Sequence, residues 1–217
     1  MMLQLADVRV SIGSKPVLHG ISFGVAPGEI VGLVGRNGAG KTTSIKSVLG
    51  LVEISQGSVA LAGRDLRTVP PHRRARLGIG YVHEDRRLLS QMSVEENILL
   101  PAWANALSDP RRRLETIYRQ IPKVREMAQR QATQLSGGQQ KMVALARALM
   151  TGTKLLLLDE PFEGLSPVMA QKMGRLLQEL RAEGYAILVA ESELKLIGSI
   201  ADRVVTIERG EIVGGNH

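Results

Sequence analysis

The sequence lacks cysteine, is poor in aromatic residues and contains no long hydrophobic run. Without Cys among 217 residues, neither a disulfide framework nor a thiolate metal site can form, which agrees with a reducing compartment. Aromatic residues make up 3%, so few rings are available to stack on a splayed strand of RNA or DNA. No window approaches the roughly 18 to 20 apolar residues that span a bilayer, and the N-terminus does not resemble a secretory signal. We therefore expect a soluble protein of the cytoplasm.

Positive charge is concentrated in the middle of the chain. The formal net charge is +7, and residues 64–87 and 109–130 each contain seven basic residues against three acidic ones. Such a surface suits a nucleic acid, an anionic lipid surface or an acidic protein, and an ordinary solvated face explains it equally well. The scarcity of aromatic residues counts against nucleic acid.

Short runs of Val, Ile and Leu recur between helix-like stretches, in a chain that is 44% hydrophobic. They predict buried parallel strands with helical crossovers at residues 29–34, 79–82, 154–158, 186–190 and 203–207. Alternation of apolar and polar residues predicts an antiparallel hairpin near one edge at 3–10 and 17–25. A second antiparallel element includes 58–61, and the tail forms a last hairpin strand. The fold class is therefore α/β, with a mostly parallel sheet and an antiparallel β subdomain.

Helical signals replace strand signals between Met92 and Met150. Amphipathic spacing dominates there, and Pro101, Pro110 and Pro122 are expected to break the helices. We predict a single domain over residues 1–217, with a core formed by 1–88 and 151–217 and a helical subdomain at 89–150.

A glycine-rich segment directly follows the first predicted parallel strand. The run GRNGAGKTT fits the pattern G-x-x-x-x-G-K-[ST] in the strand-to-helix context that this pattern requires. Its glycines let backbone N–H groups turn inward around an anion, and the following helix directs its positive end at the same point. Lys41 would contact the β- and γ-phosphates, and Thr42 would offer a hydroxyl to Mg²⁺. The predicted phosphate-binding residues are Gly35, Arg36, Asn37, Gly38, Ala39, Gly40, Lys41, Thr42 and Thr43.

Two adjacent carboxylates end a run of four leucines. Asp159 and Glu160 follow this run directly, and strand ends are where an open parallel sheet binds ligands. We expect Asp159 to hold Mg²⁺ through its waters, and Glu160 to orient or deprotonate the water that attacks the γ-phosphate. Two acids before Pro161 are, taken alone, more often a simple helix N-cap. The phosphate loop upstream reverses that balance.

A second anion-binding helix start lies at LSGGQQKMVALARAL, residues 135–149. Ser136 is a helix cap, and the N–H groups of Gly137 and Gly138 point the same way. Here the sequence resembles the ABC ATPases, whose signature is LSGGQ and whose two subunits enclose each ATP between one phosphate loop and the other subunit's signature. The resemblance covers essentially the whole chain. It implies a P-loop NTPase core, and it implies that Ser136, Gly137, Gly138 and Gln139 bind the partner's ATP.

The resemblance also assigns roles to single residues. Glu84, in YVHEDRR, stands where most members of the family have a Gln that contacts Mg²⁺ and senses the permease, which implies catalytic and metal-binding roles. Gly164, Leu165 and Ser166 match the loop that crosses the dimer interface. The acid at position 84, combined with the segments EPFEGLSP and SVEENILL, resembles the pattern of the importers that take up branched-chain amino acids.

Two positions depart from the family pattern. Ile12 stands where the family has an aromatic ring that stacks on adenine, so adenine would meet an aliphatic side chain. Ser192, in AESE, stands where a switch His normally contacts the γ-phosphate. A hydroxyl can hydrogen-bond a phosphate but cannot supply a titratable imidazole. The implied site therefore has Ile12 at the base and Ser192 at the γ-phosphate.

The resemblance implies the ATP-hydrolysing subunit of an ABC importer for a small solute, with ATP and Mg²⁺ as cofactors. Its implied partners are a second ATPase subunit, two membrane permease subunits and, indirectly, a solute-binding protein, with no nucleic acid. The chain would lie on the inner face of the membrane, bound to the permease. The alternatives are another importer or exporter, a nucleic-acid machine, suggested by the sequence pI of about 10.0, and a non-hydrolysing partner, suggested by Ile12 and Ser192.

Other candidate residues carry weaker signals. Trp103, in LPAWANAL, is expected in the core rather than at a permease contact. Arg86 and Arg87 are candidates for a docking surface beside the permease, and solvated side chains are an equal alternative. The four histidines show no metal-ligand spacing, so we expect no structural metal at His19, His72, His83 or His217.

Overall fold

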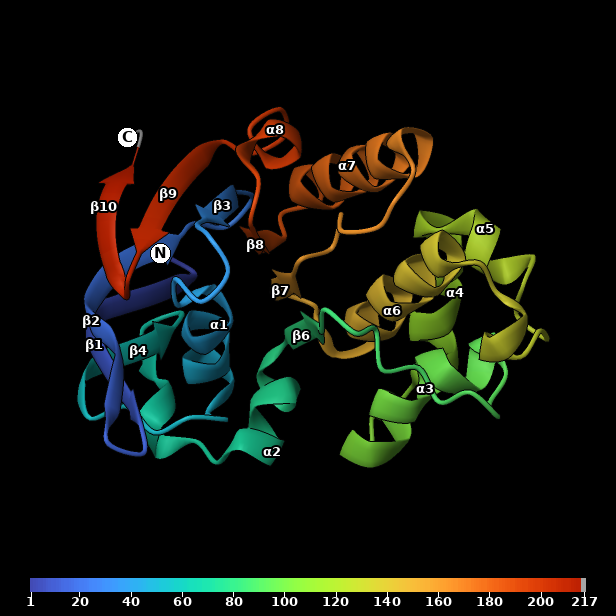
Figure 1. The fold of residues 1–217 in the computed structure, drawn as a ribbon. Coiled ribbons are helices and arrows are strands. Elements are labelled where there is room, and N and C mark those ends of the chain that lie inside the picture. Colours follow the sequence, from blue (N-terminus) through green and yellow to red (C-terminus); the bar gives the residue numbers. More distant parts are fainter. Residues whose placement is uncertain (216–217) are drawn as a thin grey trace.

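The computed structural model describes residues 1–215, in which two β-sheets are flanked by helices (Figure 1). The larger sheet has six strands in the order β10-β9-β3-β8-β7-β6. These strands are β3 (Ile30–Val34), β6 (Ile79–Val82), β7 (Leu155–Asp159), β8 (Ala186–Glu191), β9 (Arg203–Glu208) and β10 (Glu211–Gly215). The strands from β9 to β6 run parallel, and β10 pairs antiparallel with β9. The predicted mostly parallel sheet and the final hairpin strand are confirmed.

The smaller sheet is antiparallel and has the strand order β2-β1-β4-β5. Its strands are β1 (Leu3–Ile12), β2 (Lys15–Val25), β4 (Gln56–Leu61) and β5 (Arg64–Asp65). The predicted hairpin and the antiparallel β subdomain are confirmed, and β2 contacts β10 at one edge of the parallel sheet. A backbone hydrogen bond from His19 to the carbonyl of Gly210, 2.9 Å long, joins the two sheets.

Helices occupy the segment in which strand signals are missing from the sequence, and they form the right-hand side of Figure 1. The α-helices are α1 (Lys41–Leu49), α2 (Pro71–Arg74), α3 (Val94–Asn105), α4 (Pro110–Gln120), α5 (Pro122–Arg125), α6 (Gly137–Thr151), α7 (Pro167–Ala182) and α8 (Leu194–Ile197). Short 3-10 turns are η1 (Leu66–Thr68), η2 (Ala75–Leu77) and η3 (Ala132–Gln134). Within residues 1–215, no helix is both long and apolar enough to cross a bilayer.

The prolines of the helical segment do not all act as expected. Pro110 and Pro122 open α4 and α5, where a missing N–H costs nothing because the first turn has no acceptor for it. Pro101 lies inside α3, so the prediction that it breaks a helix is wrong. The helix continues because a capping box fixes its start and one face of it is buried. Beyond the proline, the Asn105 side chain donates to the Pro101 carbonyl at 2.9 Å.

Trp103 is 51% exposed, so its predicted place in the core is wrong. Helix α3 packs against α6 through a face that includes the buried residues Ile98, Leu99 and Ala102. A helix turns by about 100° per residue, so the position after Ala102 lies on the outer side. Composition alone could not show which face of α3 the tryptophan occupies.

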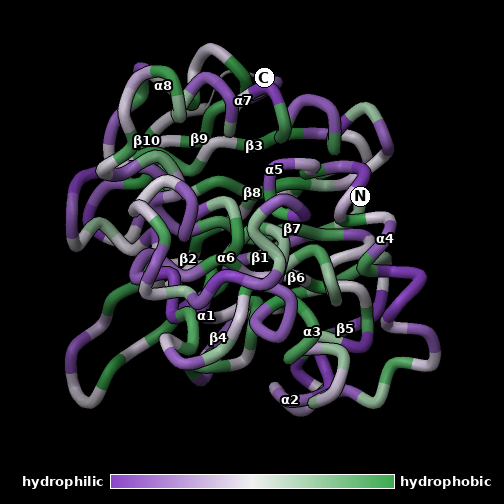
Figure 2. Tube along the Cα trace, turned by 90° about the vertical axis from the view of Figure 1, so that its right-hand side faces the viewer, coloured by the Kyte–Doolittle hydropathy of each residue, from purple (hydrophilic) through white to green (hydrophobic). Residues whose placement is uncertain are grey.

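The core divides into two clusters on opposite faces of the parallel sheet, because side chains alternate along a strand. In β7, Leu156 and Leu158 join the cluster with α6 and α7, whereas Leu155 and Leu157 join the cluster with α1 and the smaller sheet. Figure 2 shows these hydrophobic strands running through the middle of the molecule. Both faces of the sheet are therefore covered, by helices on one side and by α1 and the smaller sheet on the other.

Arg74 fixes the far end of α1, the helix that begins with Lys41. Its side chain is 6% exposed, and the guanidinium donates to the Val48 carbonyl at 2.6 Å and to the Ser47 carbonyl at 3.1 Å. Further bonds reach the carbonyls of Leu66 and Val69 at 2.7 and 3.0 Å. A cation at the C-terminus of a helix also interacts favourably with the helix dipole.

We expect Arg74→Ala to lower the free energy of unfolding by about 3 kcal/mol, because it leaves buried carbonyls without donors. Urea unfolding followed by circular dichroism measures the change. Arg76→Ala, at an exposed position of the neighbouring turn, is the matched control and should alter the stability by less than about 0.5 kcal/mol. Equal losses in the two variants would contradict the capping role of Arg74.

Candidate functional site

The loop between β3 and α1 needs glycine at two of its positions. A Cβ on Gly35 would lie 2.2 Å from the carbonyl oxygen of Ile207, which no side chain tolerates. Gly40 has a φ of 115°, and a Cβ there would lie 2.8 Å from Leu18. Gly40 also forms the N-cap of α1 without a side-chain hydrogen bond, so the first N–H groups of the helix remain available to an anion.

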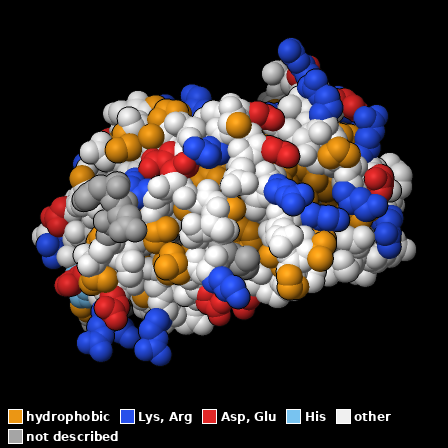
Figure 3. Space-filling model, turned by 90° about the horizontal axis from the view of Figure 1, so that it is seen from above, with side chains coloured by type: hydrophobic (Ala, Val, Ile, Leu, Met, Phe, Trp, Pro, Cys, Tyr) orange, Lys and Arg blue, Asp and Glu red, His pale blue; other side chains and the backbone are white. Residues whose placement is uncertain are grey.

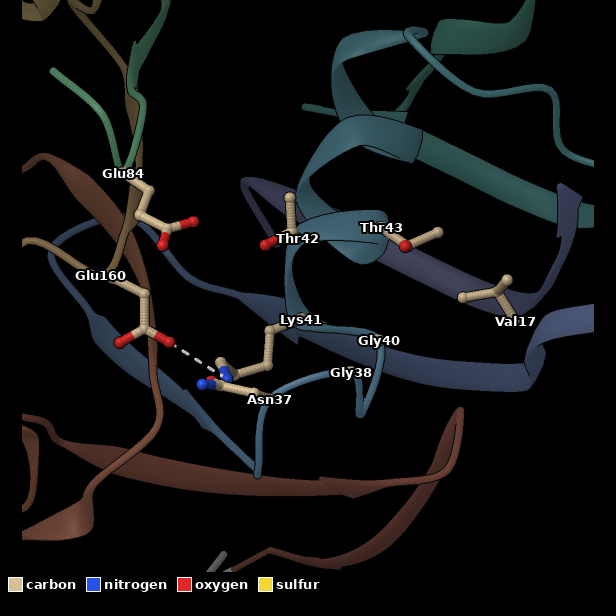
Figure 4. Close-up of a pocket in the computed structure, with 9 residues that line it drawn as sticks. All are labelled: Val17, Asn37, Gly38, Gly40, Lys41, Thr42, Thr43, Glu84 and Glu160. Atoms are coloured by element: carbon tan, nitrogen blue, oxygen red, sulfur yellow. Dashed lines mark ion pairs between the residues drawn. The ribbon is translucent and has the colours of Figure 1, made fainter.

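Lys41 lies where the loop meets two other strand ends. Its Nζ donates to the Gly35 carbonyl at 2.6 Å and to Ser192 Oγ at 3.0 Å, and it lies 3.1 Å from Glu160 Oε1. The side chain is 5% exposed. Figure 4 shows the ion pair as a dashed line, with the carboxyl groups of Glu84 and Glu160 directed toward Lys41 and Thr42. One ammonium group thus connects three predicted site residues.

Thr42 and Asp159 form an oxygen-lined position beside this lysine. The Thr42 hydroxyl donates to Asp159 Oδ1 at 3.1 Å, while Asp159 Oδ2 is buried without a hydrogen-bond partner. Burial raises the pKa of Asp159. Oxygen donors of this kind fit Mg²⁺, which takes its other ligands from water and phosphate. No group of three His, Cys, Asp or Glu side chains within residues 1–215 offers a complete protein cage for a metal.

Glu160 is held by several donors and has a left-handed backbone, with a φ of 49°. Its carboxyl group accepts the Ser192 N–H at 3.2 Å and lies 2.6 Å from the Ser192 hydroxyl. Burial would raise the pKa of Glu160, but hydrogen bonds from Ser192, Glu191 and Lys41 outweigh it and hold the pKa below its usual value. The carboxylate is therefore charged and fixed in direction, as an acceptor for a water proton must be.

Glu191 is a part of this group that sequence reasoning missed. It is 5% exposed, and its Oε1 accepts the backbone N–H of Phe162 at 2.9 Å. Burial, and then the hydrogen bond with Glu160, raise the pKa of Glu191 to about 8. The signal in the sequence is an acid at the end of a predicted strand, one position before Ser192. The raised pKa of Glu191 favours its protonated form beside the charged Glu160 at neutral pH.

The proton on Glu191 makes stability depend on pH. Between the ordinary pKa of 4.5 and the folded value of about 8, the folded chain retains a proton that the unfolded chain releases, so stability falls as pH rises. Glu191→Gln lacks this titration, so its free energy of unfolding relative to wild type should increase as pH rises from about 5 to about 8, by up to about 1.4 kcal/mol per pH unit. Urea unfolding over this range tests it, with exposed Glu193→Gln as control. A wild-type-to-variant difference that is constant with pH would refute the proton on Glu191.

A pocket of about 300 Å³ collects several of the predicted residues. It is lined by Val17, Asn37, Gly38, Gly40, Lys41, Thr42, Thr43, Glu84 and Glu160 (Figure 4). Burial, and then Glu163 and Asp159, raise the pKa of Glu84. Ile12 is 57% exposed and lies outside this lining, while Val17, which sequence reasoning did not single out, lies within it. Val17 is therefore the aliphatic side chain of this lining, in place of the predicted Ile12.

The segment predicted as a second anion site is separate from this pocket. Ser136 caps α6: its Oγ accepts the Gln139 N–H at 3.4 Å, and Gln139 Oε1 accepts the Ser136 N–H at 2.9 Å. A Cβ on Gly138 would lie 3.3 Å from Met169 and 3.5 Å from Leu165, so a small residue suits this contact. Residues 135–139 are not among those that line the pocket at the phosphate loop.

The basic residues are partly neutralised by partners. Figure 3 shows Lys and Arg side chains gathered on the side of the molecule that carries the helical segment. Exposed ion pairs there join Arg111 to Glu95 and Arg125 to Glu115. Arg86, a docking candidate, donates to Gln140 of α6 at 2.9 Å, whereas Arg87 is exposed. Of the four histidines considered as metal ligands in the sequence, His217 lies outside the described residues.

Comparison with known proteins identifies the family. The family model described as ABC transporter matches residues 18–163, a stretch that contains the phosphate loop, the signature and both strand-end acids. The chain belongs to the ABC transporter family. It is an ATP-binding subunit that couples ATP hydrolysis to transport, and its fold is that of the ABC ATPase cassette.

Relatives with different transport systems resemble the chain almost equally. It is 35% identical to the high-affinity branched-chain amino acid transport ATP-binding protein BraG of Pseudomonas aeruginosa, over 98% of this chain and 91% of that protein. It is 34% identical to the lipopolysaccharide export system ATP-binding protein LptB of Acidithiobacillus ferridurans, over 98% of this chain and 88% of that protein. The structure of the ADP conformation of MJ1267, an ATP-binding cassette of an ABC transporter, superposes with a TM-score of 0.88 at 26% identity. The superposition covers 100% of this chain and 91% of that one.

Proposed function

We propose that this ABC ATPase powers the uptake of branched-chain or other hydrophobic amino acids from the inner face of the cell membrane. It would act as a dimer with itself or a paralogue beneath two permease subunits, supplied by a solute-binding protein. The segments EPFEGLSP and SVEENILL and the identity to BraG support the solute class. The proposed division into a core (1–88, 151–217) and a helical subdomain (89–150) gives the permease a movable part to contact.

The observation that carries the ATPase part is the convergence of Lys41, Thr42, Asp159 and Glu160 on one position. Lys41 and Glu160 form an ion pair in which the lysine side chain is 5% exposed and the glutamate side chain 12%, so solvent screens their attraction little. Phosphate oxygens would replace Glu160 as the partner of Lys41, which frees the carboxylate to orient the attacking water. Mg²⁺, held by Thr42 and Asp159, would neutralise charge on the phosphates.

The second anion-binding helix start supports the dimer. Ser136, Gly137 and Gly138 lie outside the pocket of their own phosphate loop, so we assign them to the nucleotide of the other subunit. Two ATP molecules bound between subunits then favour the closed pair, and hydrolysis removes that preference. In this arrangement Ser192 would hydrogen-bond the γ-phosphate, and Glu84 would link the metal to the permease contact.

Glu160→Gln should lower kcat for ATP at least about a thousandfold while ATP still binds, because the amide cannot accept a water proton. With ATP and Mg²⁺ the variant should accumulate as a dimer in size-exclusion chromatography. The matched control is Glu179→Gln on the exposed face of α7, with an expected kcat within about twofold of wild type. Wild-type turnover in the Glu160 variant would show that another group activates the water.

The solute class needs a separate experiment. Source cells that lack the chain should lose uptake of labelled leucine, and wild-type protein, but not Lys41→Ala, should restore it. Lys41→Ala should remain folded by circular dichroism, which separates loss of ATP chemistry from loss of the protein. Uptake that persists without the chain, together with a defect in lipopolysaccharide export, would refute amino-acid import and favour the export role named for LptB.

A further inference from the structure

The backbone of Glu160 is strained at the point where the water-activating carboxylate must be fixed. A φ of 49° is costly for a residue with a Cβ, by about 1 to 2 kcal/mol. Such a conformation persists only when neighbouring groups hold it. The hydrogen bonds of Ser192 and Lys41 hold the carboxyl end, and they do not fix the peptide.

Two backbone hydrogen bonds hold the peptide of Glu160, from its N–H to the Ala190 carbonyl at 3.0 Å and from the Glu163 N–H to its carbonyl at 3.3 Å. The side chain that joins them is Lys141, a residue that sequence reasoning did not single out. Its Nζ donates to the carbonyl oxygen of Glu160 at 2.6 Å, and its side chain is 3% exposed. Burial lowers the pKa of Lys141, while the carboxylates of Glu163 and Glu191 act in the opposite direction. A buried ammonium group is costly unless it is paired, so this contact constrains the local structure strongly.

Lys141 also belongs to the helix whose first residues form the signature. It lies in α6, just over one turn from the Ser136 cap. The segment that follows Glu160 returns to the same helix start, because Leu165 and Met169 lie against the Gly138 position. The signature and the strained glutamate are therefore linked twice within one subunit, and Lys141 makes the polar link.

We propose that Lys141 is a positioning residue that ties the signature helix to the water-activating Glu160 of the same subunit. The inference rests on the proposed function, in which Glu160 acts on water and the signature binds the partner's nucleotide. A partner nucleotide at the start of α6 would hold that helix in place, and Lys141 would pass this constraint to the peptide of Glu160. Each nucleotide site would thus be sensitive to occupation of the other.

The test is Lys141→Met, which keeps the length of the side chain and removes the donor. We expect kcat for ATP to fall about tenfold with KM within about twofold of wild type, since phosphate binding is untouched. Lys141→Gln, a shorter neutral donor, should give an intermediate kcat, and it serves as the test variant if the Met variant does not fold. Lys172→Met, on the exposed face of α7, is the matched control and should retain wild-type kcat.

A second measurement separates positioning from support of the signature. In the Glu160→Gln background, Lys141→Met should leave ATP-dependent dimer formation unchanged within about twofold, because the signature still binds. Loss of the dimer, or a raised KM with an unchanged kcat, would overturn the proposal. An unchanged kcat in both Lys141 variants would overturn it as well. Absence of ATP turnover in wild type would instead refute the proposed function, so the two failures are distinguishable.

Discussion

In the parallel sheet, Val34 of β3 pairs with Glu191 of β8, and Ala190 of β8 pairs with Asp159 of β7. The three strands therefore end at one side of the sheet, where the phosphate loop, Asp159 and Ser192 lie together. A shift of one residue in either pairing would turn the side chains of a whole strand to the opposite face. In the observed register the leucines of β7 pack on both faces of the strand, and Asp159 follows at its end. The chemistry of the site thus depends on core packing remote from the nucleotide.

The charges at this edge are arranged so that neighbouring acids differ in protonation. Glu160 has a lowered pKa and is charged, whereas Glu191 has a pKa raised to about 8 and supplies a proton to the pair. Two charged carboxylates side by side would repel each other, so the proton on Glu191 lets both be buried. Lys41 binds the charged member from one side, and Lys141 binds its peptide from the other. The result is a fixed carboxylate acceptor surrounded by donors.

Local patterns in the sequence were sufficient for the strands and for the phosphate loop. Each predicted parallel strand begins within one residue of the observed one, because runs of Val, Ile and Leu mark burial on both faces. Trp103 was placed wrongly and Lys141 was not singled out, because both depend on which face of a helix meets which neighbour. Glu191 was missed because its role arises from contact with Glu160, a residue remote in sequence. Residue identity alone does not reveal such pairs.

Net charge, like residue identity, does not reveal which charged side chains are bound within the fold. Composition suggested a basic surface for a polyanion, but three arginines are bound to backbone carbonyls of the elements that form the site. Arg74 caps α1, the helix of the phosphate loop, and Arg113 binds Leu149 and Gly152 at the end of α6. Arg147 donates to the carbonyls of Arg86 and Arg87, both of which have left-handed backbones. Such arginines stabilise helix ends and a strained turn, so they count toward the architecture of the site and not toward a free electrostatic surface.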